Sequence, residues 1–204
     1  LFPRPEISPS IFHKVFADYP VVTLTRKIGD SNIPCVKVDA EEIEYLAAKY
    51  LLTNGHKKIA FRCSGSRTGS GCLKAIAEFG LSQNTVEFTT GPGSFEDGRE
   101  FFRKIYPRQD ITGVFAYNDT CAAGMIYEAA VNGIRIPERM SIIGCNNMPI
   151  ASQIFPKITT VNQPKEEQGA EATKMLLSMI ESGNECHDKI LRPDLIIRDS
   201  TRAL

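Results

Sequence analysis

Short runs of β-branched and aromatic residues alternate with longer amphipathic runs through most of this chain. The strand-like runs lie at 21–24, 35–38, 59–61, 86–88, 114–116 and 142–144. The helical runs lie at 41–53, 72–79, 95–106 and 120–131. Because neighbouring parallel strands need crossover connections, this alternation predicts an α/β fold in which helices flank parallel sheets on both faces.

Two of the strand-like runs end in short polar side chains. The run before residue 117 leads into Asn118 and Asp119, and the run before residue 145 leads into Asn146 and Asn147. Open α/β sheets bind ligands at the carboxyl ends of their strands, so these residues are candidates for a ligand site. Amide and carboxylate groups form hydrogen bonds but are poor nucleophiles, which favours recognition over catalysis.

The composition excludes several classes of protein. The 204 residues are 42% apolar, which suffices for the core of one or two domains, and 24 basic residues balance 24 acidic ones. This balance does not indicate a nucleic-acid or membrane surface, and no apolar run approaches the roughly 18 residues of a membrane span. Six scattered cysteines disfavour a zinc site or a disulfide framework, so we expect a cytoplasmic protein without metal or cofactor.

The alternation of strands and helices breaks after residue 147. An irregular segment at 148–156 precedes a β-prone run at 158–161, a long helix at 165–181 and a last strand at 194–198. We therefore expect the chain to leave one lobe, contribute to another and return, which would make a hinge. The expected N-terminal lobe comprises residues 1–54 and 165–191, and the expected C-terminal lobe comprises residues 55–162 and 192–204. The expected crossings lie near 54–56, 162–165 and 191–194.

The start of the chain predicts that the N-terminal lobe is incomplete. Residues 1–5 resemble the end of a buried strand followed by a loop. The lobe would then have only about two strands and two helices, too few to cover a parallel sheet on both faces. We expect the chain to be a fragment whose head is missing.

Five spaced motifs follow one another through the chain. They are NGHKKIA at 54–60, FAYNDTCAAG at 115–124, GIRIPERMSIIG at 133–144, PKITTVNQ at 156–163 and LIIRDST at 195–201. In order and spacing they resemble the effector-binding core of LacI/GalR-type bacterial repressors, and the match covers nearly the whole chain from Val21 on.

The resemblance implies the two-lobed periplasmic-binding-protein type I fold. It also implies that a small effector, a sugar or sugar-like molecule, binds in the inter-lobe cleft and modulates binding to operator DNA. DNA would be bound by a head domain absent from this sequence, either a helix-turn-helix or the winged helix of some GntR-type regulators. The family pattern further implies a homodimer formed through the helices near 70–79 and 127–132, and no association with membranes.

The resemblance assigns ligand contacts to individual residues. Asn118 matches an Asn that hydrogen-bonds a ligand hydroxyl, and Thr68 matches a hydroxyl position that contacts the effector. Gln163 matches a polar side chain in the segment between the lobes. The acidic position before a helix is matched by Asp39 or by Glu42.

Two positions depart from the family pattern. Asn146 stands where these repressors usually carry an Asp that grips sugar hydroxyls or a purine, and an amide supplies donors and an acceptor but no charge. Cys72 stands where sugar-responsive members hold the Arg that clamps the ligand, so Arg67 or Lys74 would have to replace it. The site expected from the resemblance therefore lacks the usual charged selectivity residues, and its ligand need not be the usual sugar. Its residues are Asn118, Asn146, Thr68, Gln163, Cys72 and Asp39.

Several residues have a structural interpretation beside the functional one. The glycine-rich loop 65–71 lacks the ending and spacing of phosphate-binding motifs, which favours a plain strand-to-helix turn over a phosphate cradle. His56 has no partner at metal-ligand spacing, which favours a structural hydrogen bond. Asn147 shapes a turn or contacts the ligand. Asp119 is expected to be the N-cap of the helix that begins near residue 120.

Two functions from different classes follow from these features. The first is the effector-binding and dimerisation domain of a LacI-family DNA-binding transcription regulator. The alternative is a solute-binding protein of a sugar transporter with the same fold. Unpaired cysteines and the segment 198–201 favour the regulator. An enzyme is a distant third, because no Ser-His-Asp, Cys-His or paired-carboxylate arrangement lies at a predicted strand end, and no catalytic residue is assigned.

Overall fold

The computed structural model describes residues 10, 14, 16, 18–29, 31–63 and 69–204, which form two compact units. Unit 1 combines Leu1–Asp39 with Pro164–Arg192, and unit 2 combines Ala40–Gln163 with Pro193–Leu204. Two of the three divisions fall inside the crossings expected near 162–165 and 191–194. The first division differs from the one expected near 54–56, because the helix at 40–53 packs within unit 2.

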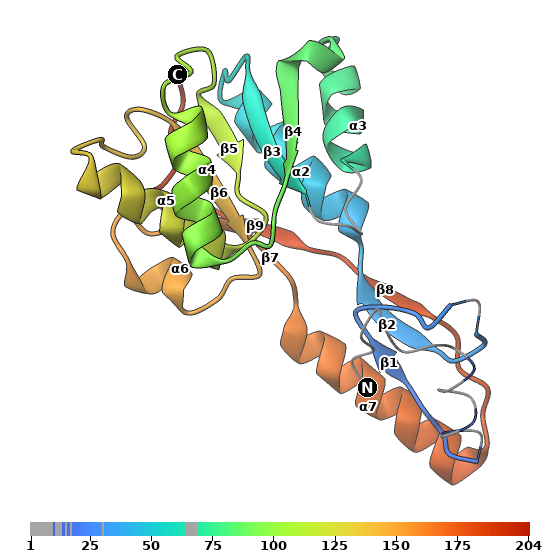
Figure 1. The fold of residues 1–204 in the computed structure, drawn as a ribbon. Helices are drawn as coiled ribbons and strands as arrows, with labels where there is room; N and C mark the ends of the chain where they lie inside the picture. Colours follow the sequence, from blue (N-terminus) through green and yellow to red (C-terminus); the bar gives the residue numbers. More distant parts are fainter. Residues whose placement is uncertain (1–9, 11–13, 15, 17, 30, 64–68) are drawn as a thin grey trace. The chain divides into compact units, whose positions relative to one another are not determined.

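Unit 1 contains a small parallel sheet (Figure 1). Its strand order is β1 (Thr23–Leu24), β2 (Cys35–Val38) and β8 (Lys189–Leu191). The sequence analysis did not predict β8, because its three residues lie between charged neighbours and give no alternating pattern.

One long helix, α7 (Lys165–Ser182), covers a face of the unit 1 sheet. Its apolar side packs on Val22, Val36 and Leu191. The buried amide of Gln168 adds a hydrogen bond from Nε2 to the Val36 carbonyl, 2.8 Å long. The helix ends at Gly183, whose φ of 64° is the left-handed conformation that glycine adopts at helix ends.

Unit 2 is built on a six-stranded sheet with the order β4-β3-β5-β6-β7-β9. In this order the strands are Val86–Thr90, Ile59–Cys63, Gly113–Phe115, Ser141–Cys145, Thr159–Asn162 and Asp194–Ile196. The first five strands are parallel, which confirms the predicted α/β class. Only β9 is antiparallel to its neighbour, pairing Asn162 of β7 with Asp194.

Helices cover both faces of the unit 2 sheet (Figure 1). On one face α2 (Ala40–Thr53) packs against α3 (Ser70–Glu78), and on the other α4 (Phe95–Ile105) packs against α5 (Asp119–Val131). The segment expected to be irregular contains a short helix, α6 (Ile150–Gln153), and a 3-10 turn, Gln83–Thr85, precedes β4. Among the described residues, no helix is both long enough and apolar enough to span a bilayer.

Helices α4 and α5 approach each other through two glycines. A Cβ atom added to Gly98 would lie 2.0 Å from the Cys121 carbonyl oxygen, and one added to Gly124 would lie 2.0 Å from the Phe95 carbonyl oxygen. Only glycine therefore fits at these two positions of the helix pair.

Residues 200–204 form hydrogen bonds with several other segments of unit 2. The buried Ser200 hydroxyl donates to the Ile142 carbonyl at 2.6 Å and accepts from the Thr159 amide at 2.9 Å. At the end of the chain, the Leu204 amide donates to the Asn54 carbonyl at 2.9 Å. Unit 2 is thus completed by a segment that follows the return of the chain from unit 1.

Candidate functional site

The carboxyl ends of the parallel strands share one edge of unit 2. The register pairs Phe115 of β5 with Ile143 of β6, so these neighbouring strands end within two residues of each other. The segments that follow β5, β6 and β7 carry Asn118, Asn146 and Gln163. Three of the residues expected to bind a ligand therefore lie at the same edge, where open α/β sheets bind ligands.

The backbone at strand ends adopts an unusual conformation. Among the non-glycine residues that the structure describes, positive φ angles occur at Thr25, Tyr117, Asn146 and Asn147, with values of 72°, 66°, 94° and 47°. Each of these residues closely follows a parallel strand, and three of them follow β5 or β6. A left-handed conformation costs free energy for a bulky residue such as Tyr117 and less for asparagine, and such conformations cluster at functional sites, which supports this edge as a ligand site.

Asn118 is the N-cap of α5. Its Oδ1 accepts from the Cys121 amide at 2.7 Å, and its Nδ2 donates to the Gly93 carbonyl at 2.9 Å. The expectation that Asp119 would be the N-cap was wrong by one position, because Asp119 is already helical and its buried carboxylate accepts from the Met148 amide at 2.6 Å. The Asn118 amide is held in one orientation, and its contact with a ligand stays a prediction.

Asn146 and Gln163 meet directly. Gln163 Nε2 donates to Asn146 Oδ1 at 2.5 Å, and the Cys145 thiol donates to the same oxygen at 3.5 Å. The backbone amide of Asn146 donates to the Val161 carbonyl at 2.9 Å. The side-chain oxygen of Asn146 is therefore turned toward the protein, and its contact with a ligand stays a prediction, as does that of Gln163.

Asn147 is held by the structure around it. Its Oδ1 accepts from Arg198 Nη2 at 2.8 Å, and its backbone amide donates to Thr160 Oγ1 at 3.3 Å. Arg198 also donates from Nη1 to the Ile158 carbonyl at 2.7 Å. These contacts favour the turn-shaping interpretation of Asn147, and they give Arg198 a structural role that the sequence analysis did not assign.

A buried ion pair supports the loop beside Asn118. Arg62 of β3 and Asp97 of α4 have side chains only 8% and 9% exposed, and they form two hydrogen bonds, one of them 2.9 Å from Nε to Oδ2. Asp97 Oδ2 also accepts from the Gly93 amide at 3.0 Å. The Gly93 carbonyl accepts from Asn118. Gly93 therefore links the ion pair to Asn118 through hydrogen bonds of its own backbone.

Sequence reasoning missed this ion pair. The available signal was an arginine inside the otherwise apolar strand 59–63, since a buried charge in such a run needs a partner. Asp97 is one of several acidic residues at the start of α4, and its sequence position alone does not distinguish it from Glu96.

The other residues expected to bind the ligand are Cys72, Asp39 and Thr68. Cys72 is fully buried in α3, and burial raises the pKa of its thiol well above the ordinary value, so it has no surface for a ligand. Lys74, the possible substitute for the missing Arg, lies 3.8 Å from Glu41 on the solvent side of α3. Asp39 belongs to unit 1, where its amide donates to the Leu191 carbonyl at 3.1 Å. Thr68 and Arg67 lie outside the described residues.

The start of α3 is occupied by an internal carboxylate. The buried Glu44 of α2 accepts from the Gly69 amide through Oε1 and from the Gly71 amide through Oε2, both at 3.2 Å. These amides are the donors that a phosphate would need at a helix start. The structure therefore favours the strand-to-helix turn over the phosphate cradle.

His56 has the structural role that the sequence favoured. Its ring nitrogens lie 2.9 Å from Thr112 Oγ1 and 3.3 Å from the Arg202 carbonyl oxygen. Burial lowers the pKa of the imidazole, which keeps the ring neutral. In the described part of the chain, no group of three or more His, Cys, Asp or Glu side chains is placed to hold a metal ion.

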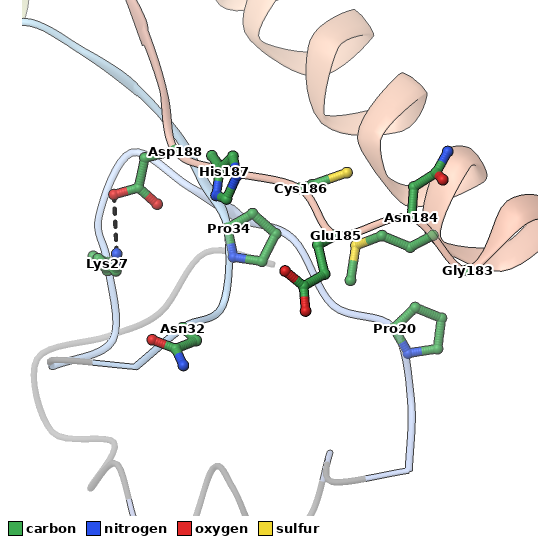
Figure 2. A pocket seen from close by; sticks show the side chains of 11 residues that line it. Pro20, Lys27, Asn32, Pro34, Gly183, Asn184, Glu185, Cys186, His187 and Asp188 are labelled. Carbon is green, nitrogen blue, oxygen red and sulfur yellow. Dashed lines mark hydrogen bonds and ion pairs between the residues drawn. The ribbon is translucent and has the colours of Figure 1, made fainter.

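Unit 1 contains a separate cavity of about 850 Å³ (Figure 2). It lies near the amino ends of the strands, between α7 and the segments around Asn32 and Glu185. Lys27 and Asp188 form a 3.0 Å ion pair on its wall, and Asp188 also accepts from the Cys35 amide at 3.1 Å. No residue expected to bind the ligand lines this cavity.

The comparisons with known proteins agree with this architecture. Residues 48–201 match the family model described as the periplasmic binding protein-like domain. The chain belongs to this family. Among solved members, a LacI family transcriptional regulator from Enterococcus faecium with bound ribose superposes with a TM-score of 0.88 at 27% identity, covering 97% of this chain and 77% of that one. The expected resemblance to LacI-type effector-binding cores is therefore confirmed.

Sequence relatives of this periplasmic binding protein-like domain are transcription regulators. It is 34% identical to the HTH-type transcriptional repressor PurR of Vibrio vulnificus over 199 residues, which cover 92% of this chain and 59% of that protein. It is 31% identical to the arabinose metabolism transcriptional repressor of Geobacillus stearothermophilus, covering 91% of this chain and 54% of that protein. The chain thus spans little more than half the length of these relatives.

Proposed function

We propose that this chain is the effector-binding part of a cytoplasmic LacI-type transcription regulator. The carboxyl edge of the unit 2 sheet carries the proposal, because Asn118, Asn146 and Gln163 lie there and because Tyr117, Asn146 and Asn147 have positive φ angles. The relatives named as repressors favour a regulator over the alternative, a solute-binding protein of a transporter, and over an enzyme.

The ligand that suits this edge is small, polar and uncharged, such as a sugar or a molecule of similar size. Most side chains at the strand ends are amides, and the charged groups beside them already have partners within the protein. Arg62 is paired with Asp97, Arg198 donates to Asn147, and Asp119 accepts from the Met148 amide. A ligand that binds one conformation of the protein better than another shifts the population toward it. In the full-length protein this shift would change the affinity of a DNA-binding head for operator DNA.

Ligand binding is tested by a thermal-shift screen of sugars, nucleobases and amino acids. A ligand at about 100 times its dissociation constant adds roughly 2.7 kcal/mol to the free energy of unfolding. Asn118→Ser retains an N-cap oxygen but removes the amide, and it should abolish the shift without losing the cap. Asn84→Ala changes an exposed residue of the 3-10 turn and serves as the control. Full binding by Asn118→Ser would refute the placement of the site.

We also propose that the full-length regulator is a homodimer that uses the outer side of α5. Tyr127 and Val131 are 50% and 61% exposed and lie four residues apart, so they present apolar surface side by side on one face of this helix. Val131→Glu should shift the equilibrium toward monomer in analytical ultracentrifugation. Leu177→Glu, at a position of α7 that is 47% exposed, is the matched control. Equal dissociation of both variants, or of neither, would contradict an interface on α5.

A further inference from the structure

The side-chain amide of Asn118 points in one direction because backbone groups hold both of its ends. Oδ1 accepts from the Cys121 N–H at 2.7 Å, and Nδ2 donates to the Gly93 carbonyl at 2.9 Å. A backbone N–H can only donate and a carbonyl oxygen can only accept, so the polarity of both partners is fixed. Rotation of the amide by half a turn would place donor against donor at Cys121 and acceptor against acceptor at Gly93. The position of the Gly93 carbonyl therefore decides the direction of the Asn118 amide.

Residue 93 has no side chain that could hold this carbonyl in place. The φ of Gly93 is 73°, and a Cβ atom added there would lie 2.3 Å from Tyr117 Cδ1, so a side chain at this position would displace the Tyr117 ring. The carboxylate of Asp97 holds the glycine instead, since its Oδ2 accepts from the Gly93 N–H at 3.0 Å. The Asp97 backbone amide also donates to Ser94 Oγ at 3.1 Å. Asp97 thus bonds two consecutive residues of the loop that precedes α4.

The guanidinium of Arg62 fixes Asp97 in turn. Arg62 donates from Nε to Oδ2 at 2.9 Å and from Nη2 to Oδ1, a bidentate geometry that holds a carboxylate in one orientation. The guanidinium carbon lies 4.6 Å from the centre of the Phe101 ring, and both charged side chains are about nine-tenths buried. A carboxylate can accept from Arg62 and from Gly93 at once, because both of its oxygens are acceptors. The charge of Asp97 therefore matches Arg62, and one of its acceptor oxygens holds Gly93.

We propose that Asp97 is a positioning residue for the ligand, which fixes the direction of the Asn118 amide through the backbone of Gly93. This inference rests on the proposed function only for the contact between Asn118 and a ligand. The hydrogen bonds from Gly93 to Asp97 and from Asn118 to Gly93 belong to the ligand-free protein. Once Arg62 is replaced by an apolar side chain, ligand affinity should depend on an acceptor at residue 97 and not on a charge there.

Two double variants separate the acceptor from the charge. Arg62→Met with Asp97→Asn removes both charges but keeps an acceptor oxygen, and the Gly93 N–H sets the direction of the new amide because it can only donate. Arg62→Met with Asp97→Leu also removes both charges, and it leaves the Gly93 N–H without this acceptor. The two proteins have the same net charge and differ in one side chain of similar size. A difference between them therefore reports on the acceptor.

Nuclear magnetic resonance tests the positioning without any ligand. The scalar coupling across the hydrogen bond, between Asn118 Nδ2 and the Gly93 carbonyl carbon, should be seen in the wild-type chain and in the Asp97→Asn double variant. It should disappear in the Asp97→Leu double variant. Absence of the coupling in the wild-type chain, or its persistence in a folded Asp97→Leu double variant, would overturn the inference.

Titration calorimetry tests the effect on binding. The probes are D-ribose, L-arabinose and the compound that gives the largest thermal shift in the screen. The Asp97→Leu double variant should bind roughly fivefold to tenfold more weakly than the wild-type chain, which is the effect of about one lost hydrogen bond. The Asp97→Asn double variant should restore most of the affinity. Asn84→Ala, in the 3-10 turn outside this network, should bind like the wild-type chain.

The outcomes separate this inference from the proposed function. Equal affinities of the two double variants for a probe that the wild-type chain binds would overturn the role of Asp97 and leave the chain an effector-binding protein. A coupling that depends on Asp97 as expected, together with no binding of any compound in the screen by the wild-type chain, would overturn the proposed function and leave the positioning of Asn118 supported.

Discussion

Removal of the Arg62 guanidinium tests how much the buried ion pair beside the Gly93 loop contributes to the stability of unit 2. Arg62 and Asp97 are about nine-tenths buried and share two hydrogen bonds, and Asp97 also accepts from the Gly93 amide. Arg62→Met removes the cation but keeps an unbranched apolar stem, so it leaves the Asp97 carboxylate buried without its partner. Breaking one side of a buried ion pair costs about 3–5 kcal/mol, and we expect a loss in this range.

The loss is measured from urea unfolding followed by far-ultraviolet circular dichroism, since the chain contains no tryptophan. With a slope of about 2 kcal/mol per molar urea, the midpoint of the unit 2 transition should fall by roughly 2 M. The double variant Arg62→Met with Asp97→Leu replaces the pair by apolar groups and should recover most of the lost stability.

The double-mutant cycle decides whether the reasoning holds. A loss below about 1 kcal/mol in Arg62→Met would show that water replaces the guanidinium and that the pair is not effectively buried. Losses of the two single variants that simply add in the double variant would show that the residues act independently.

Three further outcomes follow from contacts described above. Glu44→Ala leaves the first amides of α3 without their internal carboxylate and should cost about 3 kcal/mol in urea unfolding, whereas Glu44→Gln should lose less because it keeps one acceptor. Burial lowers the pKa of His56, so the folded state disfavours its protonation, and the free energy of unfolding should fall as the pH drops below the unfolded pKa of about 6.5 toward the lower folded pKa. His56→Gln should weaken that dependence in unfolding curves at several pH values, and an unchanged slope would assign it to other groups. Gly124→Ala should prevent close packing of α4 on α5 and lower the melting temperature, while Gly169→Ala, in α7 with open space around it, should raise stability by about 0.5–1 kcal/mol. Equal effects of the two alanines would contradict the close approach at Gly124.

The alternation of strands and helices was predictable because each element has its own hydrophobic period. Local patterns predicted much of the buried side of α2, but not its buried charge. The apolar spacing within 41–53 indicates a stripe through Ile43, Leu46, Ala47, Tyr50 and Leu51; the structure buries Ile43, Ala47 and Leu51 of this stripe, together with Glu44. The buried carboxylate of Glu44 accepts from backbone amides at the start of α3. The spacing of residues within α2 gives no information about a hydrogen-bond partner on another helix.

The gathering of polar side chains at one edge of the unit 2 sheet was predictable, but the contacts between them were less so. The polar residues after β5 and β6 lie at one edge because parallel strands end on the same side. The N-cap of α5 was expected at Asp119 and lies at Asn118, because helix starts are uncertain by one or two residues in sequence. The contact between Asn146 and Gln163 joins the residues that follow β6 and β7, so its geometry depends on the register of the sheet.

The division of unit 2 into two chain segments has a consequence for protein synthesis. When residue 163 leaves the ribosome, β7 is the outermost strand of a nearly complete sheet, and its pairing strand β9 lies about thirty residues further on. At about 5–20 residues per second, this edge stays open for roughly 2–6 seconds of translation. An open edge strand can pair with another nascent chain. The order of synthesis therefore exposes this sheet to misassembly until residues 193–204 have been made.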